Sequence, residues 1–185
     1  STDGGVTWSA PTFAFGADKS WMVIDRTAGI GAGHIYCAWN AFSGCCGMDS
    51  FNRSIDGGSS FSDVTPPYAD SEAVPFLTKL TMDLASPSIL YTATNFLWKT
   101  TNGGGSWLKV CPDLGPAISA IAVCRGNSSF VVVASGNGIQ KSTNGGATFS
   151  APLTNGLPQK FTTHVEIDGS NVNTFYVTYA GGTTG

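Results

Sequence analysis

Acidic side chains gather in one stretch of the chain, between Asp63 and Phe76. Asp70 and Glu72 stand two positions apart there, close to Tyr68. Two carboxylates beside a sugar can act as acid and base, or as acid and nucleophile, and their separation decides the stereochemistry of glycoside hydrolysis. Asp70 and Glu72 are therefore the candidate catalytic residues. The alternative is a solvated acidic loop that binds a cation loosely.

Other chemistries find less support in the sequence. The nine basic residues are scattered and the net charge is −3, so the chain lacks the electrostatic footprint of a nucleic-acid-binding protein. His34 and His164 lie far apart without an HExxH pattern, so we expect no metal site. The glycine pairs lack the Lys-Ser/Thr of a phosphate loop, and no cofactor is expected. No run approaches the ~18 apolar residues of a membrane span.

The composition indicates a globular all-β protein. Hydrophobic residues make up 42% of the chain, which is enough for a core, and only 11% of residues are charged. Glycine occurs 24 times, and Gly or Pro interrupts nearly every window in which a helix of ordinary length could form.

A short motif recurs four times, with the pattern [ST]-x-[DN]-G-G-x-[ST]-[WF]. Its Asp or Asn can accept hydrogen bonds from nearby backbone N–H groups, and the glycine pair supplies positive φ. The closing aromatic residue begins the next strand and covers the turn. The Asp/Asn and aromatic positions are Asp3 and Trp8, Asp56 and Phe61, Asn102 and Trp107, and Asn144 and Phe149.

This motif resembles the Asp-box, or bacterial neuraminidase repeat, of sialidase-like secreted proteins. The resemblance implies a β-propeller of four-stranded antiparallel blades, with each box joining the third and fourth strands. About four blades are expected in a single domain, residues 1–185, with repeat units at about 1–53, 54–99, 100–141 and 142–185. We expect a fragment of a larger propeller; the alternative is a small ring closed by residues 1–15.

Apolar runs bounded by turn residues predict the strands between the boxes. First strands are expected at 20–26, 77–83, 118–124 and 163–168, and second strands at 34–40, 89–95, 129–135 and 174–180. Third strands are expected at 51–54, 96–100 and 138–142, and fourth strands at 59–64, 105–110 and 147–152. The Asn137-Gly138 pair marks a hairpin.

The same resemblance places the boxes on one face, the box face, as scaffold, and puts ligand sites among the variable loops of the other. Residues 18–40 are similar to a D-K-P-W segment of such proteins, which implies that Trp21 is a stacking platform for a sugar ring. The alternative for Trp21 is a core residue between blades. The candidate ligand-binding residues are Asp18, Trp21, Asp49 and Tyr68.

The resemblance does not extend to complete sialidase chemistry. Sialidases of this family hold the substrate carboxylate with three arginines, whereas Arg26, Arg53 and Arg125 all lean toward the box face. We therefore expect a module that binds glycans or other extracellular protein subunits without a complete catalytic set. The alternatives are a fragment of a sialidase-like glycoside hydrolase and a subunit of an extracellular assembly.

The cysteines and sequons favour a secreted or periplasmic protein. Cys45 or Cys46 is expected to form a disulfide with Cys111, on the same face of the neighbouring blade, whereas Cys37 is a core residue. Asn127 is the glycosylation candidate because its sequon falls in a turn between strands.

Overall fold

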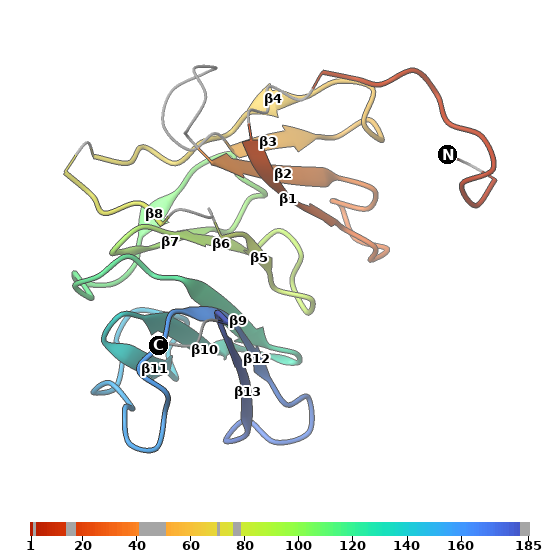
Figure 1. The fold of residues 1–185 in the computed structure, drawn as a ribbon. Helices are drawn as coiled ribbons and strands as arrows, with labels where there is room; N and C mark the ends of the chain where they lie inside the picture. The colour runs from red at the N-terminus through yellow and green to blue at the C-terminus, as the bar shows by residue number, and fades with distance from the viewer. Residues whose placement is uncertain (2, 14–17, 41–50, 70, 76–78, 182–185) are drawn as a thin grey trace.

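A computed structural model describes residues 1, 3–13, 18–40, 51–69, 71–75 and 79–181 (Figure 1). Within these residues the secondary structure is all β, without helices. The strands are β1 (Asp18–Ile24), β2 (Ile35–Asn40), β3 (Phe51–Ser54), β4 (Ser62–Asp63), β5 (Thr81–Met82), β6 (Leu90–Ala93), β7 (Leu97–Thr100), β8 (Leu108–Lys109), β9 (Ala120–Cys124), β10 (Asn127–Ser135), β11 (Gly138–Ser142), β12 (Thr162–Ile167) and β13 (Phe175–Tyr179).

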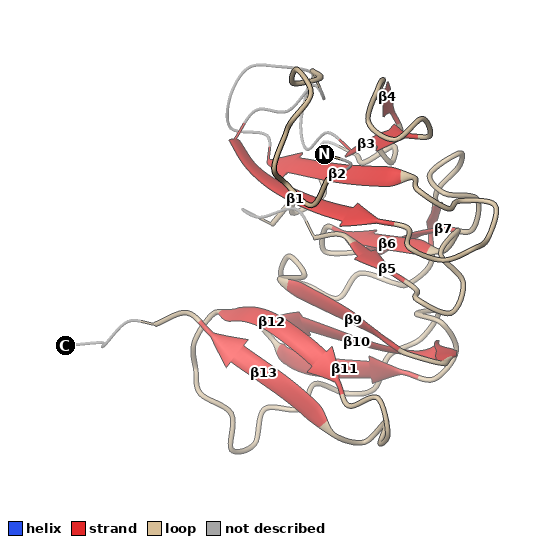
Figure 2. Ribbon diagram, turned by 90° about the vertical axis from the view of Figure 1, so that its right-hand side faces the viewer, coloured by secondary structure: helices blue, strands red, loops and turns tan. Residues whose placement is uncertain are grey.

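The strands form four antiparallel sheets, each a simple meander. Two sheets have four strands, β1-β2-β3-β4 and β5-β6-β7-β8; a third has three, β9-β10-β11; and a fourth has two, β12-β13. The first three sheets follow one another from the top to the bottom of Figure 1, and the fourth sheet packs on the third (Figure 2). The predicted first and second strands are confirmed in all four sheets.

The core lies between the faces of successive sheets. Tyr36, Ala38 and Phe51 of the first sheet pack against Leu80, Met82 and Leu90 around the second. Similar buried clusters join the second sheet to the third and the third to the fourth. The middle strands β6 and β10 are buried on both faces, as expected for sheets covered on two sides, whereas β12 buries one face and exposes the other.

The predicted fourth strand of the third sheet, residues 147–152, is wrong. In the first two sheets the N–H of Val64 or Val110 donates to the third strand, at 2.7 and 2.9 Å. The third sheet has Pro152 at the corresponding position, and proline has no N–H to donate. The bond moves one residue on, to Leu153, which forms an isolated bridge with Ile139.

The four boxes share one hydrogen-bonded geometry. In the second box the Ser54 hydroxyl donates to Asp56 at 2.7 Å, and the N–H of Gly58 and Ser60 donate to Ser54 and Asp56 at 2.8 and 2.9 Å. The other three boxes repeat these contacts. The glycine pair has positive φ in every box, as predicted.

The third box also joins two sheets. Arg53 of β3 donates from Nη1 to the carbonyl of Gly103 at 2.7 Å. Trp107 donates from Nε1 to the carbonyl of Val64 at 2.7 Å, and its ring packs edge-on against Phe51. In the first box the aromatic Trp8 is 77% exposed and bonds only within its own turn. The boxes are thus self-contained turns whose aromatic residue can fasten one sheet to the preceding one.

Replacing Asp56 by Asn is expected to leave the stability unchanged at neutral pH and to reduce its acid sensitivity. Bonds from the Ser60 hydroxyl and N–H and from Ser54 lower the pKa of Asp56 from 3.8 to about 2. A lowered folded-state pKa gives stability that is present above the unfolded value and is lost as the pH falls toward the folded one. Asn accepts the same backbone bond in the third and fourth boxes and does not titrate.

Thermal unfolding between pH 7 and pH 2 tests this expectation. The matched variant Asp56→Ala removes the acceptor and should be destabilised at every pH. An Asn variant that unfolds as readily as the Ala variant at pH 7 would contradict it.

Candidate functional site

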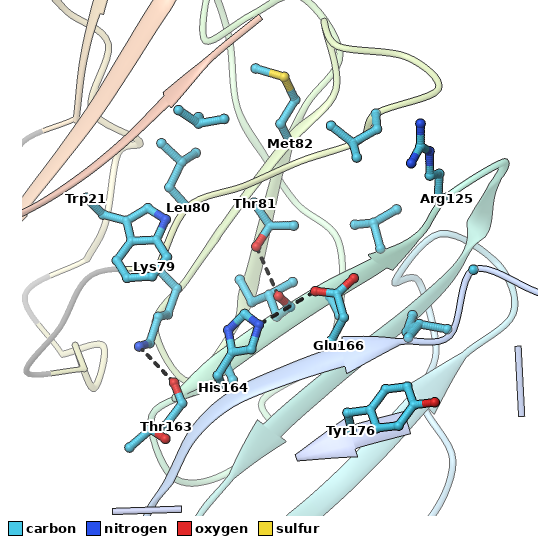
Figure 3. Close-up of a pocket in the computed structure, with 18 of the residues that line it drawn as sticks. Trp21, Lys79, Leu80, Thr81, Met82, Arg125, Thr163, His164, Glu166 and Tyr176 are labelled. Carbon is cyan, nitrogen blue, oxygen red and sulfur yellow. Dashed lines mark hydrogen bonds and ion pairs between the residues drawn. The ribbon is translucent and has the colours of Figure 1, made fainter. Parts of the chain in front are cut away.

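A groove of about 570 Å³ runs along the first strands of all four sheets. Trp21, Met22 and Val23 of β1 form one wall, and the segment from Lys79 to Leu84 crosses its floor (Figure 3). The lining is completed by residues 120–123 of β9, Arg125, residues 163, 164 and 166–169, and Tyr176. The groove therefore collects side chains from segments far apart in the sequence.

Trp21 and Lys79 form one end of the groove. The Trp21 side chain is 50% exposed, and Lys79 Nζ lies 5.9 Å from the centre of its indole ring. Lys79 also donates to the carbonyl of Thr163 at 3.4 Å (Figure 3). Burial lowers the pKa of Lys79 below its ordinary value. A flat aromatic surface and a cation thus stand side by side.

Strand β12 supplies the opposite wall. Val165 and Ile167 are buried against the third sheet, so the alternating residues His164 and Glu166 point to the groove. His164 Nε2 lies 3.6 Å from Glu166 Oε2, and both side chains are largely exposed. This exposed pair with its long contact offers polar groups to the groove and lacks the short hydrogen bond of a catalytic dyad.

Asp168 marks the far end of this wall. It accepts bonds from the hydroxyl and N–H of Ser170, and the Tyr176 hydroxyl donates to it at 3.0 Å. These bonds, led by the Ser170 hydroxyl, lower the pKa of Asp168 to about 2. Asp168 is therefore an anion at any physiological pH.

Comparison with known proteins gives structural neighbours. No protein-family model matches the chain, and no curated protein matches it. The GH74 enzyme of Niastella koreensis is similar with a TM-score of 0.59 and 23% identity, over 80% of this chain and 24% of that one. The GH74 xyloglucanase from Xanthomonas campestris gives 0.60 and 17%, over 80% and 25%. The extracellular domain of a putative one-component system from B. thetaiotaomicron gives 0.58 and 15%, over 79% and 19%.

The fold is that of a β-propeller. The sheets are its blades, and the chain spans about a quarter of the length of the GH74 enzymes it matches. Propeller blades surround a central channel. The groove is lined by the first strand of each blade, so it lies where the blades converge.

The structure places Glu72 away from the groove. Its side chain is 2% exposed and accepts bonds from Lys109 Nζ at 2.7 Å, Thr94 Oγ1 at 2.5 Å and Trp98 Nε1 at 3.0 Å. Burial alone would raise the pKa of Glu72, but these bonds outweigh it and leave the pKa below its ordinary value. Glu72 is thus an ionised anchor for its loop, and the expectation of a solvated acidic loop does not hold for it. Asp70 lies outside the described residues.

The remaining candidates are spread over the fold. Tyr68 packs edge-on against Trp98 at 5.6 Å, and its hydroxyl lies 3.1 Å from Thr92 Oγ1, so it belongs to the Glu72 cluster and not to the groove. Asp18 begins β1, and its backbone pairs with Asn40. Asp49 lies outside the described residues. Of the four ligand-binding candidates, the structure brings only Trp21 into the described lining of the groove.

The expected disulfide at Cys111 is not formed. Cys111 is a free, buried thiol whose sulfur accepts the N–H of Leu97 at 3.0 Å, so it takes a place in the core. Cys45 and Cys46 lie outside the described residues. Cys37 is also free and buried. Asn127 is exposed at the start of β10, and its Oδ1 accepts the N–H of Ser129.

A second cavity, of about 600 Å³, opens on the box face between the turn at residues 25–34 and the third box. Its charged groups already bond within its walls. Asp25 accepts the N–H and hydroxyl of Thr27, and Arg53 donates to Gly103. Arg26, Arg53 and Arg125 were all expected to lean toward the box face. Arg125 lines the groove instead.

The described residues contain no group of three His, Cys, Asp or Glu side chains placed to hold a metal ion. They also contain no helix long and apolar enough to cross a membrane.

Sequence reasoning missed Lys79, His164, Glu166 and Tyr176 as groove residues. The signal for His164 and Glu166 was the period-two alternation over residues 164–167 of β12, where these two polar residues alternate with Val165 and Ile167. Such a pattern identifies the polar face of a strand, but it does not show which other segments that face lies next to.

Proposed function

We propose that this chain is a secreted Asp-box β-propeller module that binds carbohydrate in the groove and carries no complete catalytic set. The groove between Trp21 and Tyr176 is the binding site in this proposal. The Asp-box resemblance, the extracellular neighbour domain and the low charge support a secreted setting.

The observation that carries the proposal is the half-exposed indole of Trp21 at the wall of a groove that is lined by both apolar and polar side chains. A pyranose ring has apolar C–H faces and a rim of hydroxyl groups. An exposed aromatic ring packs against the C–H faces, and side chains with hydrogen-bond donors and acceptors bind the hydroxyl groups. His164, Glu166 and Thr163 supply such groups in the same groove.

The second candidate function is part of a glycoside hydrolase. The GH74 neighbours favour it, and the groove does hold two carboxylates, Glu166 and Asp168. We rank it second because Asp168 is held ionised by its own bonds and Glu166 is exposed beside His164. The environment of Asp168 does not favour a protonated carboxyl, which hydrolysis requires of its general acid, and the one polar contact of the Glu166 side chain among the described residues is the long one to His164.

The test is a glycan array followed by titration of the best ligands. Replacing Trp21 by Ala should weaken binding about tenfold, since a stacked aromatic ring contributes up to about 1.5 kcal/mol. Trp8→Ala is the matched control, because Trp8 is 77% exposed in the first box and does not line the groove. Equal binding by both variants, or no glycan binding by the wild type, would refute the proposal.

Product analysis on the same ligands separates binding from hydrolysis. Turnover that disappears in a Glu166→Gln variant would favour the hydrolase. Extracellular protein subunits are the alternative partners in our proposal, and light scattering of the purified protein tests self-association.

A further inference from the structure

Lys79 is the one lysine of the groove lining, and its charge has no counter-ion among the described residues. Its contacts are the Trp21 ring, at 5.9 Å, and a long bond of 3.4 Å to the Thr163 carbonyl. Lys109 shows the contrast, because it forms an ion pair with Glu72 at 2.7 Å. A partly buried ammonium is costly unless an anion accompanies it. The missing partner can come from a ligand.

The charges of the groove are separated along its length. Lys79 lies beside Trp21 at one end, whereas Glu166 lies on the β12 wall (Figure 3). Asp168 directly follows β12 and accepts the Tyr176 hydroxyl, so it also lies away from Lys79. Glu166 is accompanied by His164, and Asp168 by Ser170 and Tyr176. Arg125 faces the groove near this second end. An anionic group would therefore be attracted at the Lys79 end, whereas a second anionic group farther along would meet two carboxylates, Glu166 and Asp168, against the single cation of Arg125.

We infer that the groove selects a glycan with one carboxylate, an acidic sugar whose ring stacks on Trp21 and whose carboxylate pairs with Lys79 Nζ, followed by neutral sugars along β12. This inference rests on the proposed function and names its ligand class. The indole and the ammonium are close enough to contact one sugar residue together. The lowered pKa of Lys79 fits an ammonium that burial deprives of water without supplying a counter-ion.

The experiment compares two probes by calorimetry: a xylo-oligosaccharide bearing a single glucuronic acid, and the same compound with its carboxyl reduced to a hydroxymethyl group. The two differ only in the charged group. We expect the acid to bind about tenfold more tightly, as for a hydrogen bond to a charged group. Lys79→Met should abolish this difference, and Lys79→Arg should retain most of it.

Lys160→Met is the matched control, because Lys160 lies in the segment before β12 and outside the groove lining. It should leave the difference unchanged. Thermal unfolding of each variant verifies the fold, and Lys79→Arg keeps the test informative if Lys79→Met unfolds.

The outcomes separate this inference from the proposed function. Equal binding of the two probes overturns the inference and leaves carbohydrate binding standing. Binding of neither probe, with none on the glycan array, overturns both. Tighter binding of a fully charged oligogalacturonate than of the singly charged probe overturns the inferred charge pattern, since Glu166 and Asp168 should repel the added carboxylates.

Discussion

Replacing Glu72 by Ala is expected to destabilise the protein by about 3 kcal/mol, near the lower end of the range for breaking a buried ion pair. The carboxylate accepts bonds from Lys109, Thr94, Trp98 and the N–H of Ala69. Its removal leaves the indole N–H of Trp98 and the Thr94 hydroxyl buried without an acceptor. Lys109 is 35% exposed and can recover some hydration, which keeps the loss at the lower end.

The control is Glu166→Ala, the same change at the other glutamate of the chain. Glu166 is 63% exposed, and its contact with His164 is long, so this variant should lose less than about 1 kcal/mol. Urea unfolding followed by tryptophan fluorescence measures both. If Glu72→Ala were as mild as Glu166→Ala, Glu72 would not anchor its loop.

The pH dependence gives the same cluster a second readout. The pKa of Glu72 lies below its ordinary value of 4.5 in the folded protein. Its stabilisation is therefore complete above that value and is lost as the pH falls through the folded pKa. The Glu72→Gln variant has no carboxyl to titrate at this position. Its free energy of unfolding should be lower than that of the wild type at neutral pH, and this difference should become smaller in acid.

The repeating part of this fold could be predicted because its signals are local. A box holds its own hydrogen bonds within about eight residues, and period-two alternation marks each strand without reference to the rest of the chain. The sequence of Ser54 to Phe61 thus predicts the turn that the structure contains. The one failed strand also has a local cause, since Pro152 lacks the N–H that Val64 and Val110 donate.

The site could not be predicted to the same extent because its contacts are long-range. Glu72 and Lys109 are 37 positions apart, and Lys79 meets Thr163 across two blades. The sequence around an acidic loop residue does not show whether its side chain faces water or a buried indole. The long-range packing of the chain decides between these two environments. The same holds for Cys111, which was expected in a disulfide and is a buried thiol of the core.

Replacing Gly103 by Ala is expected to cost about 3 kcal/mol, from backbone strain and from a steric conflict between blades. Gly103 has a φ of +64°, where a side chain is strained. A Cβ there would also lie 2.8 Å from the Tyr36 hydroxyl. Its carbonyl accepts the bond from Arg53, so a shift of the box would loosen the junction of the first two blades.

Gly57 separates the two contributions, because it holds the corresponding place in the second box with a φ of +70° and has open space around its Cβ position. Gly57→Ala should therefore show the strain alone, about 1 kcal/mol. The double variant Tyr36→Phe with Gly103→Ala removes the hydroxyl that the new methyl group would meet, so its loss should fall toward that of Gly57→Ala. Equilibrium unfolding of the four variants, including Tyr36→Phe alone, completes a cycle. A double variant that is no more stable than Gly103→Ala would show that the hydroxyl contact is not the cause, and that strain or the Gly103 carbonyl dominates at this junction.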